Sequence, residues 1–309
     1  GAKSLHQVLA HITGMKRMQR CQVNLDELFS APQEQGMDFA EVKGQQVVKR
    51  GLEIAAAGGH NCLMIGTPGS GKTMLAQRIP TILPDLTFEE ALEITKIHSA
   101  AGLMTMETPL VTKRPFRSPH HSVSTVSLVG GGRIPKPGEV SLAHNGVLFL
   151  DEMPEFRKDA LEILRQPLED RKVTISRVNA SITYPSNFML IAAMNPCKCG
   201  YFGDPTHNCT CSMAQIHQYM HRISGPLLDR IDLHIEVAPV EYAHLAQTKP
   251  EETSASIKKR VNRARVLQRA RYQNQGIYCN AELSSAQLDR YCTLGTTEKK
   301  LLETAFQRL

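Results

Sequence analysis

The stretch Gly66-Thr67-Pro68-Gly69-Ser70-Gly71-Lys72-Thr73 decides the fold of this chain. It matches the pattern G-x-x-x-x-G-K-S/T and lies between the apolar run Cys62 to Ile65 and the helix-like Met74-Leu75-Ala76. In such a loop the glycines let successive backbone N–H groups point at phosphate oxygens, and the helix that follows adds its positive N-terminal end. Lys72 would reach the outer phosphates, and the Thr73 hydroxyl would ligate Mg²⁺. The sequence therefore predicts a phosphate loop for ATP with Mg²⁺, the alternative being a Gly-rich turn without a ligand.

A second apolar run ends in two acidic residues, in Gly146-Val147-Leu148-Phe149-Leu150-Asp151-Glu152. Its apolar positions do not alternate with polar ones, which indicates a strand buried on both faces of a parallel sheet. Because α/β proteins bind ligands at the carboxyl ends of such strands, Asp151 is expected to hold Mg²⁺ through water. Glu152 is the candidate base that orients the attacking water. Taken alone, such a pair is more often a solvated turn, but the phosphate loop favours the catalytic interpretation.

A third apolar run, Phe188 to Ala193, predicts another strand, and Asn195 follows it. If this strand lies next to the acid-bearing one, its end reaches the same edge of the sheet. The Asn195 amide is then placed to contact the γ-phosphate and the attacking water.

The segment 225–233 carries an arginine, Arg230, just before another strand-like run. An arginine in this rigid segment could stay exposed at a subunit edge and reach the nucleotide of a neighbouring subunit, because its planar fork suits phosphate oxygens. The alternatives are that Arg230 pairs with Asp229 or Asp232, and that Arg222 acts across the interface instead.

Together, the phosphate loop, the acid-bearing strand, Asn195 and the Arg230 segment resemble the AAA+ ATPases. One branch is similar in three further stretches, residues 41–45 (Glu-Val-Lys-Gly-Gln), 117–121 (Arg-Ser-Pro-His-His) and 141–146 (Ser-Leu-Ala-His-Asn-Gly). That branch is the Mg-chelatase-like AAA+ family of bacteria, of the ComM and YifB type. The resemblance runs from about Asp38 to the C-terminus and implies a ring-forming, ATP-driven motor.

For the ComM type, the resemblance implies a homo-hexameric DNA helicase that drives branch migration in recombination and in the integration of DNA taken up during natural transformation. Two other functions stay open. The first is a chelatase-like motor subunit that remodels a protein partner, and the second is a nucleotide-dependent scaffold that does not hydrolyse ATP.

Strands that alternate with helices predict an α/β fold with a parallel sheet and helices on both faces. We expect residues 1–36 to be a connector from an absent N-terminal domain, 37–242 to be the AAA+ ATPase core, and 243–309 to be a smaller helical lid. In the resembling family a Lon protease-like domain precedes the connector, and the lid carries a second sensor arginine. The sequence has no matching arginine segment, so the lid is expected to be truncated.

Two β-hairpin inserts are expected, Val126 to Val140 with a Gly-rich tip and Lys172 to Tyr184. In the resembling family the matching inserts line the pore of the ring. Basic residues on such tips suit a grip on the DNA backbone that does not read sequence. The residues expected to contact DNA are Arg133, Lys136, Arg177 and Asn179. Each hairpin could instead be a packing loop between subunits or a plain surface loop, and a basic helix from Ser254 could be a solvated lid face or a second DNA contact.

Four of the eight cysteines form a C-x-C…C-x-C pattern, Cys197, Cys199, Cys209 and Cys211. The residues between the pairs favour turns, and four thiolates within tetrahedral reach favour a structural Zn²⁺. His207 is an alternative ligand, and a metal-free loop with reduced thiols is the alternative structure.

Composition narrows the class of partner. The 309 residues carry a net charge of +6, which suits a polyanion without being diagnostic. Tryptophan is absent and aromatic residues make up 5 %, so contacts to phosphates are expected to outweigh base stacking. No apolar stretch approaches the roughly 18 residues of a membrane span and no secretory leader is recognisable. We therefore expect a cytoplasmic protein with no membrane partner.

Overall fold

The computed structural model describes residues 2, 4–18, 29, 36–105, 109–132, 135–177, 180–239, 251–273 and 275–308, with the backbone alone for Arg177 and Ala180. The chain divides into two compact units, Gly1–Gly36 and Met37–Leu309. The first contains α1 (Leu5–Ile12), which begins where the Ser4 hydroxyl accepts a hydrogen bond from the Gln7 backbone N–H. The helices and strands described below belong to the second unit.

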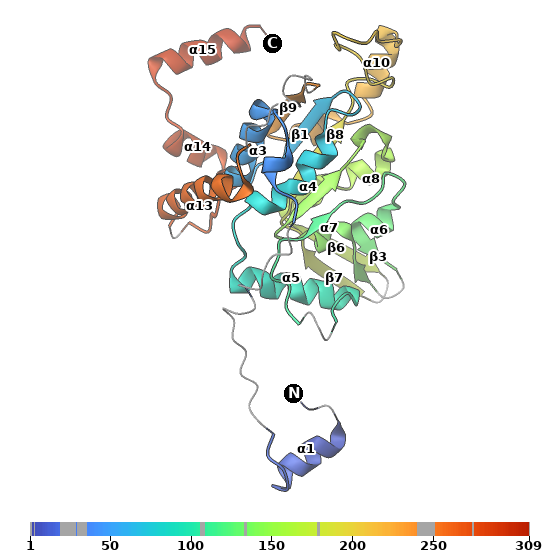
Figure 1. Ribbon diagram of the computed structural model, residues 1–309, viewed down its shortest axis with the longest axis vertical. Coiled ribbons are helices and arrows are strands. Elements are labelled where there is room, and N and C mark those ends of the chain that lie inside the picture. Colours follow the sequence, from blue (N-terminus) through green and yellow to red (C-terminus); the bar gives the residue numbers. More distant parts are fainter. Residues whose placement is uncertain are drawn as a thin grey trace. The chain divides into compact units, whose positions relative to one another are not determined.

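A five-stranded sheet lies at the centre of the second unit (Figure 1). Its order is β2 (Phe116–Arg117), β5 (Val147–Leu150), β8 (Met189–Met194), β1 (Cys62–Gly66) and β9 (Leu233–Val237). Every adjacent pair is parallel, which confirms the predicted α/β fold. β8 comes late in the chain yet lies between β1 and β5, so three predicted strands are direct neighbours.

Both faces of the sheet are buried, as the runs without alternation predict. In β5, Phe149 belongs to one hydrophobic cluster and Leu148 to the other, because successive strand residues point to opposite faces. Three helices complete the first cluster, namely α3 (Gln46–Gly58), α4 (Lys72–Ile82) and α13 (Ser254–Arg271). Each large side chain buried in this way contributes about 1.5–3 kcal/mol relative to exposure, which holds the sheet between its two layers.

Further helices surround this centre. Their bounds are η1 (Phe39–Glu41), α5 (Phe88–Ala101), α6 (Thr125–Val129), α7 (Glu139–Leu142), η2 (Met153–Glu155), α8 (Lys158–Glu162), α9 (Arg165–Asp170), α10 (Met213–Met220), α11 (Gly225–Leu228), η3 (Asn280–Glu282), α14 (Ser285–Tyr291) and α15 (Thr296–Phe306). Local sequence sets several of these starts. α5, for example, begins at a capping box in which Thr87 and Glu90 bind each other's backbone N–H groups.

One predicted hairpin is confirmed and the other is only partly right. β6 (Lys172–Arg177) pairs antiparallel with β7 (Ala180–Pro185), as expected for residues 172–184. The first hairpin is limited to β3 (Gly130–Gly131) and β4 (Lys136–Pro137), and helices α6 and α7 flank it. The prediction for residues 126–129 was wrong because the Ser124 hydroxyl accepts the Ser127 N–H at 3.1 Å and so caps a helix.

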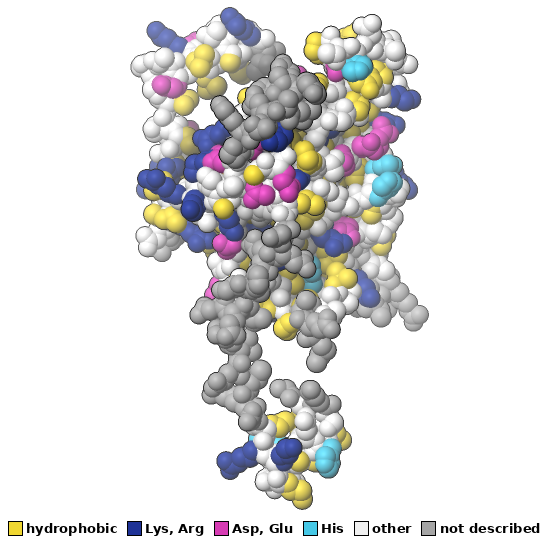
Figure 2. Space-filling view, viewed as in Figure 1, with side chains coloured by type: hydrophobic (Ala, Val, Ile, Leu, Met, Phe, Trp, Pro, Cys, Tyr) yellow, Lys and Arg dark blue, Asp and Glu magenta, His cyan; other side chains and the backbone are white. Residues whose placement is uncertain are grey.

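The helix predicted from Ser254 is α13, which packs on α3 and α4 through buried side chains that include Ile257 and Val261. Figure 2 shows basic side chains gathered over this part of the surface. Some of them bind within the chain: Arg260 pairs with two glutamates and lowers the pKa of the Glu252 carboxyl to about 2. Among the described residues, no helix is both long and apolar enough to cross a membrane.

Candidate nucleotide site and cysteine cluster

The phosphate loop joins the carboxyl end of β1 to the first turn of α4. Gly71 is the N-cap residue of α4 and has φ +88, a left-handed conformation that favours glycine. The Lys72 ammonium lies inside the loop and donates to the carbonyl oxygens of Gly66 and Thr67, both at 2.8 Å. Burial lowers the pKa of Lys72, while the charges of Asp151 and Glu152 act in the opposite direction.

The carboxyl ends of β5 and β8 bring two more predicted residues to the phosphate loop. The Thr73 hydroxyl lies 2.7 Å from Asp151 Oδ2, and the Lys72 ammonium lies 3.2 Å from Asn195 Oδ1. Asp151 follows β5 and Asn195 follows β8, so both side chains emerge at the edge where β1 ends. A hydroxyl and a carboxylate in contact are oxygen ligands of the kind that Mg²⁺ prefers, and the donor set fits this ion.

Glu152 is exposed at the end of β5, in a left-handed conformation with φ +51 that is uncommon outside glycine. Its backbone N–H donates to Asp151 Oδ1 at 2.9 Å. Its carboxylate lies 3.7 Å from the Nδ1 atom of His121, a contact that sequence reasoning missed. No local pattern marks this contact: residues 118–121 continue from β2, which pairs in parallel with β5 and ends opposite Leu148, so the chain then runs toward the carboxyl end of β5.

Tyr219, on α10, is the second site residue that sequence reasoning missed. It is buried, and its hydroxyl lies near the Asn195 backbone N–H. Burial raises the pKa of Tyr219 to about 12, with a smaller contribution from the charge of Glu155. Tyr219 therefore stays neutral at physiological pH. No local pattern marks it, because α10 reaches the site only through the fold.

The two candidate arginines lie in different places. The Arg230 carbonyl accepts a hydrogen bond from Asn61, the residue before β1, so Arg230 lies at the amino edge of the sheet. The Lys72 ammonium lies at the other edge, separated by strands of five residues that span about 15 Å. The Arg230 side chain forms an ion pair with Glu169, whereas sequence reasoning named Asp229 or Asp232 as its partner within the chain.

Arg222 lies on the nucleotide side of the sheet. Its guanidinium donates to the Pro154 carbonyl at 3.1 Å and to Glu155 at 2.8 Å. These contacts hold the Arg222 side chain within its own chain, at the two residues that follow Met153 after Glu152.

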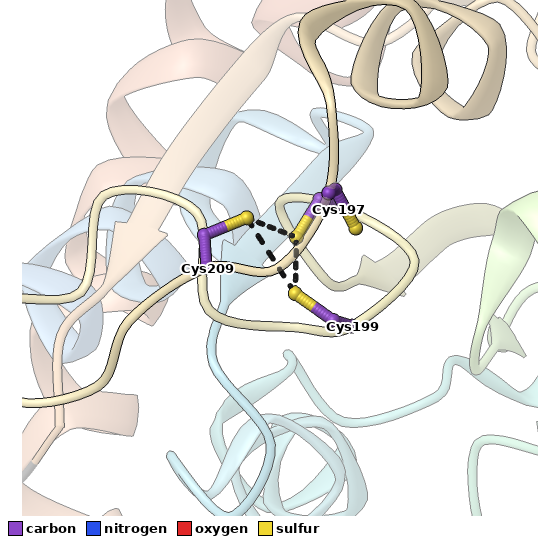
Figure 3. Close-up of side chains that lie close together, drawn as sticks. Cys197, Cys199 and Cys209 are labelled. Atoms are coloured by element: carbon purple, nitrogen blue, oxygen red, sulfur yellow. Dashed lines mark hydrogen bonds between the residues drawn. The ribbon is translucent and has the colours of Figure 1, made fainter.

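The four predicted cysteines form one cluster in the cysteine loop, which we define as residues 197–211. Figure 3 shows how Cys197, Cys199 and Cys209 point toward one another. Their sulfur atoms all lie within 4.8 Å of one another, and Cys197 lies 3.3 Å from Cys199 and 3.7 Å from Cys209. Backbone N–H groups of Tyr201 and Thr210 lower the pKa of the Cys199 thiol to about 5, which favours the thiolate that metals bind.

The proposed substitute ligand, His207, lies apart from this cluster. Its ring stacks on Tyr201 at 4.8 Å, and its Nδ1 atom lies 3.5 Å from Asp204. Among the described residues, the group with metal-binding geometry consists of the four cysteines.

Of the residues predicted to contact DNA, two can be placed. Lys136 is exposed on β4, and the Arg177 backbone ends β6. Arg133 and Asn179 lie outside the described residues. Beside Arg177, the outer face of the β6–β7 hairpin carries exposed hydroxyl pairs, Thr174 with Thr183 at 3.0 Å and Ser176 with Ser181 at 3.3 Å.

Comparisons with known proteins agree with this geometry. Residues 38–245 match the family described as magnesium chelatase, subunit ChlI, and residues 251–309 match its C-terminal family. The chain is 49 % identical over 267 residues to the uncharacterized protein YifB of Escherichia coli, covering 86 % of this chain and 51 % of YifB. It is 48 % identical over 276 residues to the competence protein ComM of Haemophilus influenzae, covering 88 % and 52 %.

A more distant relative is the magnesium-chelatase 67 kDa subunit of Heliobacterium mobile, 25 % identical over 260 residues, with 72 % of this chain and 37 % of the relative covered. The chain spans about half the length of the curated relatives YifB and ComM. The family match covers the sheet, the phosphate loop and the residues that meet it. The chain therefore belongs to the magnesium chelatase ChlI family, the Mg-chelatase-like branch of the AAA+ ATPases, and is of the YifB and ComM type.

Proposed function

We propose that this chain is the ATP-hydrolysing part of a ring-forming motor that moves DNA, as a helicase or in branch migration during recombination and natural transformation. The observation that carries the ATPase assignment is the meeting of three strand ends. There, Lys72 and Thr73 of the phosphate loop contact Asn195 and Asp151 at 3.2 and 2.7 Å. Such an arrangement holds a nucleotide with Mg²⁺ and positions a water against its last phosphate.

Each residue has one task in this proposal. The loop N–H groups and Lys72 bind the phosphates, and Thr73 with Asp151 holds Mg²⁺, which would neutralise charge that develops on the leaving phosphate. Glu152 is exposed at the mouth of the site, accepts a proton from water and orients it. Asn195 binds the γ-phosphate and the water through its amide.

Hydrolysis is proposed to need a second subunit. Arg230 lies at the amino edge of the sheet, too far from the nucleotide of its own chain, so it can complete only a neighbour's site. In a closed ring, here a hexamer, every subunit offers its phosphate loop to one neighbour and its Arg230 to the other. For this role, the Arg230 guanidinium would leave its ion pair with Glu169 and bind phosphate oxygens of the neighbour's nucleotide instead.

DNA is the proposed substrate because of the hairpins. Positive tips beside exposed hydroxyl groups suit phosphates, which basic side chains and Ser or Thr contact without reading sequence. One relative carries the name competence protein, which fits a role with incoming DNA. The chelatase subunit name of a distant relative supports the second candidate, a motor that remodels a protein partner.

The cysteine cluster is proposed to hold one structural Zn²⁺. A tetrahedral site with Zn–S bonds near 2.3 Å places its sulfur atoms about 3.8 Å apart. The sulfur atoms of Cys197, Cys199 and Cys209 lie 3.3–3.7 Å apart, and that of Cys211 lies within 4.8 Å of them. Four protein ligands leave no open position, so the metal would fold the loop and would not take part in the reaction.

Replacement of Glu152 by Gln tests the base. The amide keeps the size of the side chain and cannot take a proton, so we expect nucleotide affinity near wild type and ATP hydrolysis slower by about 10² or more. Glu303→Gln, an exposed change on α15, is the control and should leave both values unchanged. Near-normal turnover by Glu152→Gln would reject the assignment.

Mixed rings test the shared site. Arg230→Ala and Lys72→Ala should each be inactive alone, and mixing them should restore part of the activity, because some interfaces then combine an intact phosphate loop with an intact Arg230. ATP turnover against mixing ratio is the measurement, with ring formation checked by light scattering. Recovery in mixtures with Arg222→Ala, and none with Arg230→Ala, would assign the role to Arg222.

Metal analysis tests the cluster. Freshly purified protein should contain about one zinc per chain, and Cys209→Ser combined with Cys211→Ser should lose it. Cys292→Ser changes an exposed cysteine outside the cluster and should keep the metal. Zinc that is missing from wild type, or unchanged in the double variant, contradicts the proposal.

Charge removal on the hairpins separates a DNA motor from a protein-remodelling one. Neutralising Arg133, Lys136 and Arg177 should leave basal ATP hydrolysis intact, weaken binding to all DNA sequences and lower the salt slope by about one unit per lost phosphate contact. Strand unwinding and branch migration should stop. Neutralising Lys299, Lys300 and Arg308 on the C-terminal segment removes the same charge and serves as control. If the hairpin variant moved DNA at the wild-type rate, the hairpins would not be the DNA contact. The result would favour α13 as the DNA contact, or a protein as the substrate.

A further inference from the structure

The cysteine loop is joined to the nucleotide site at its beginning. Asn195 contacts Lys72, and the chain continues through Pro196 directly into Cys197, which is fully buried. A single residue, Pro196, thus separates Asn195 from the first cysteine of the cluster. A shift of Cys197 would be passed to Asn195 with little chain in between to absorb it.

The loop also packs on the phosphate loop itself. Gly200 is buried and has φ +92, and a β-carbon built on it would lie 2.6 Å from both Cγ and Cδ of Pro68. Real β-carbons do not come this close to another carbon, so the two loops touch with no room for a side chain between them. Pro68 is a residue of the phosphate loop, which makes this a direct contact between the cysteine cluster and the nucleotide site.

The end of the cysteine loop returns to the same place. Ser212, directly after Cys211, caps α10 by accepting the Gln215 N–H at 3.3 Å. α10 then carries Tyr219 to the backbone N–H of Asn195, and Arg222 follows at the Pro154 carbonyl. The segment from Asn195 to Arg222 therefore leaves the nucleotide site, passes through the cluster and closes on the site again.

We propose that the cysteine cluster positions the phosphate loop and Asn195, so that metal binding by the four thiolates and nucleotide binding by the phosphate loop strengthen each other. This inference rests on the nucleotide site proposed above. A metal that closes the loop removes its conformational freedom, and the Gly200–Pro68 contact transmits this order to the phosphate loop. Because coupling between two binding sites is reciprocal, nucleotide should also hold the metal more tightly.

Two glycines of the cysteine loop offer a matched pair of variants. Gly200→Ala puts a methyl group against Pro68, whereas Gly203 has a similar φ of +80 and no atom within 4 Å of a built β-carbon. Both alanines carry comparable backbone strain at positive φ, so the difference in nucleotide affinity between them reports the contact with Pro68. We expect Gly200→Ala to bind a fluorescent ATP analogue about tenfold more weakly than Gly203→Ala, with zinc content equal in both. Equal affinities in the two variants overturn the proposal.

A compensating change tests the contact in a second way. Pro68→Ala removes the ring atoms that the new methyl group would meet, so Gly200→Ala should weaken nucleotide binding less in the Pro68→Ala background than in wild type. An unchanged effect would mean that Gly200 acts through the cysteine loop alone, against the proposal.

Metal release from unaltered protein provides a test that needs no variant to fold. Zinc transfer to a chromogenic chelator should slow about tenfold when an ATP analogue and Mg²⁺ are present, and Lys72→Ala should abolish this protection. A wild type that binds no nucleotide refutes the proposed function. A wild type that binds nucleotide but releases zinc at the same rate with and without it refutes the coupling alone.

Discussion

Parallel pairing of β8 with both β1 and β5 is the constraint on which the site depends. The register aligns Cys62 with Ile191 and Val147 with Met189, so the carboxyl ends of the three strands reach the same edge of the sheet. The phosphate loop, Asn195 and Asp151 follow those ends, and their contacts result from the strand order. A sheet with β8 at its edge would keep every motif and still separate Asn195 from Lys72.

The same sheet places Arg230 at its amino edge, opposite the phosphate loop. One chain therefore carries the candidate nucleotide site at one edge and a candidate partner for another chain's site at the other. Rigid strands between the two edges keep this separation fixed, because every central strand is buried on both faces and paired on both sides. This geometry is the physical basis for proposing a ring, in which hydrolysis needs two subunits.

The cysteine cluster lies next to the candidate nucleotide site. A structural metal at a remote surface would stabilise only its own loop, whereas this loop begins at Asn195, touches Pro68 through Gly200 and ends at a helix that carries Tyr219 back to Asn195. Small errors in the position of catalytic groups lower the reaction rate strongly. A loop that contacts Asn195 and the phosphate loop can therefore affect catalysis as well as its own folding.

The sequence by itself determined the features that depend on local chemistry. The phosphate loop, the strands before Asp151 and Asn195, the second hairpin, the helix from Ser254 and the set of four cysteines all follow from residue spacing and apolar pattern within short windows. Such short windows failed at residues 126–129, which were predicted as part of a hairpin but form a helix capped by Ser124.

Only the tertiary structure decided which distant residues meet. It placed His121 beside Glu152, Tyr219 on Asn195, Gly200 against Pro68 and Arg230 against Glu169. None of these contacts has a local signature, because each depends on the order of the strands and on the path by which loops return to the sheet. Burial of two hydrophobic clusters fixes that order, and it is a property of the whole chain that no single motif encodes.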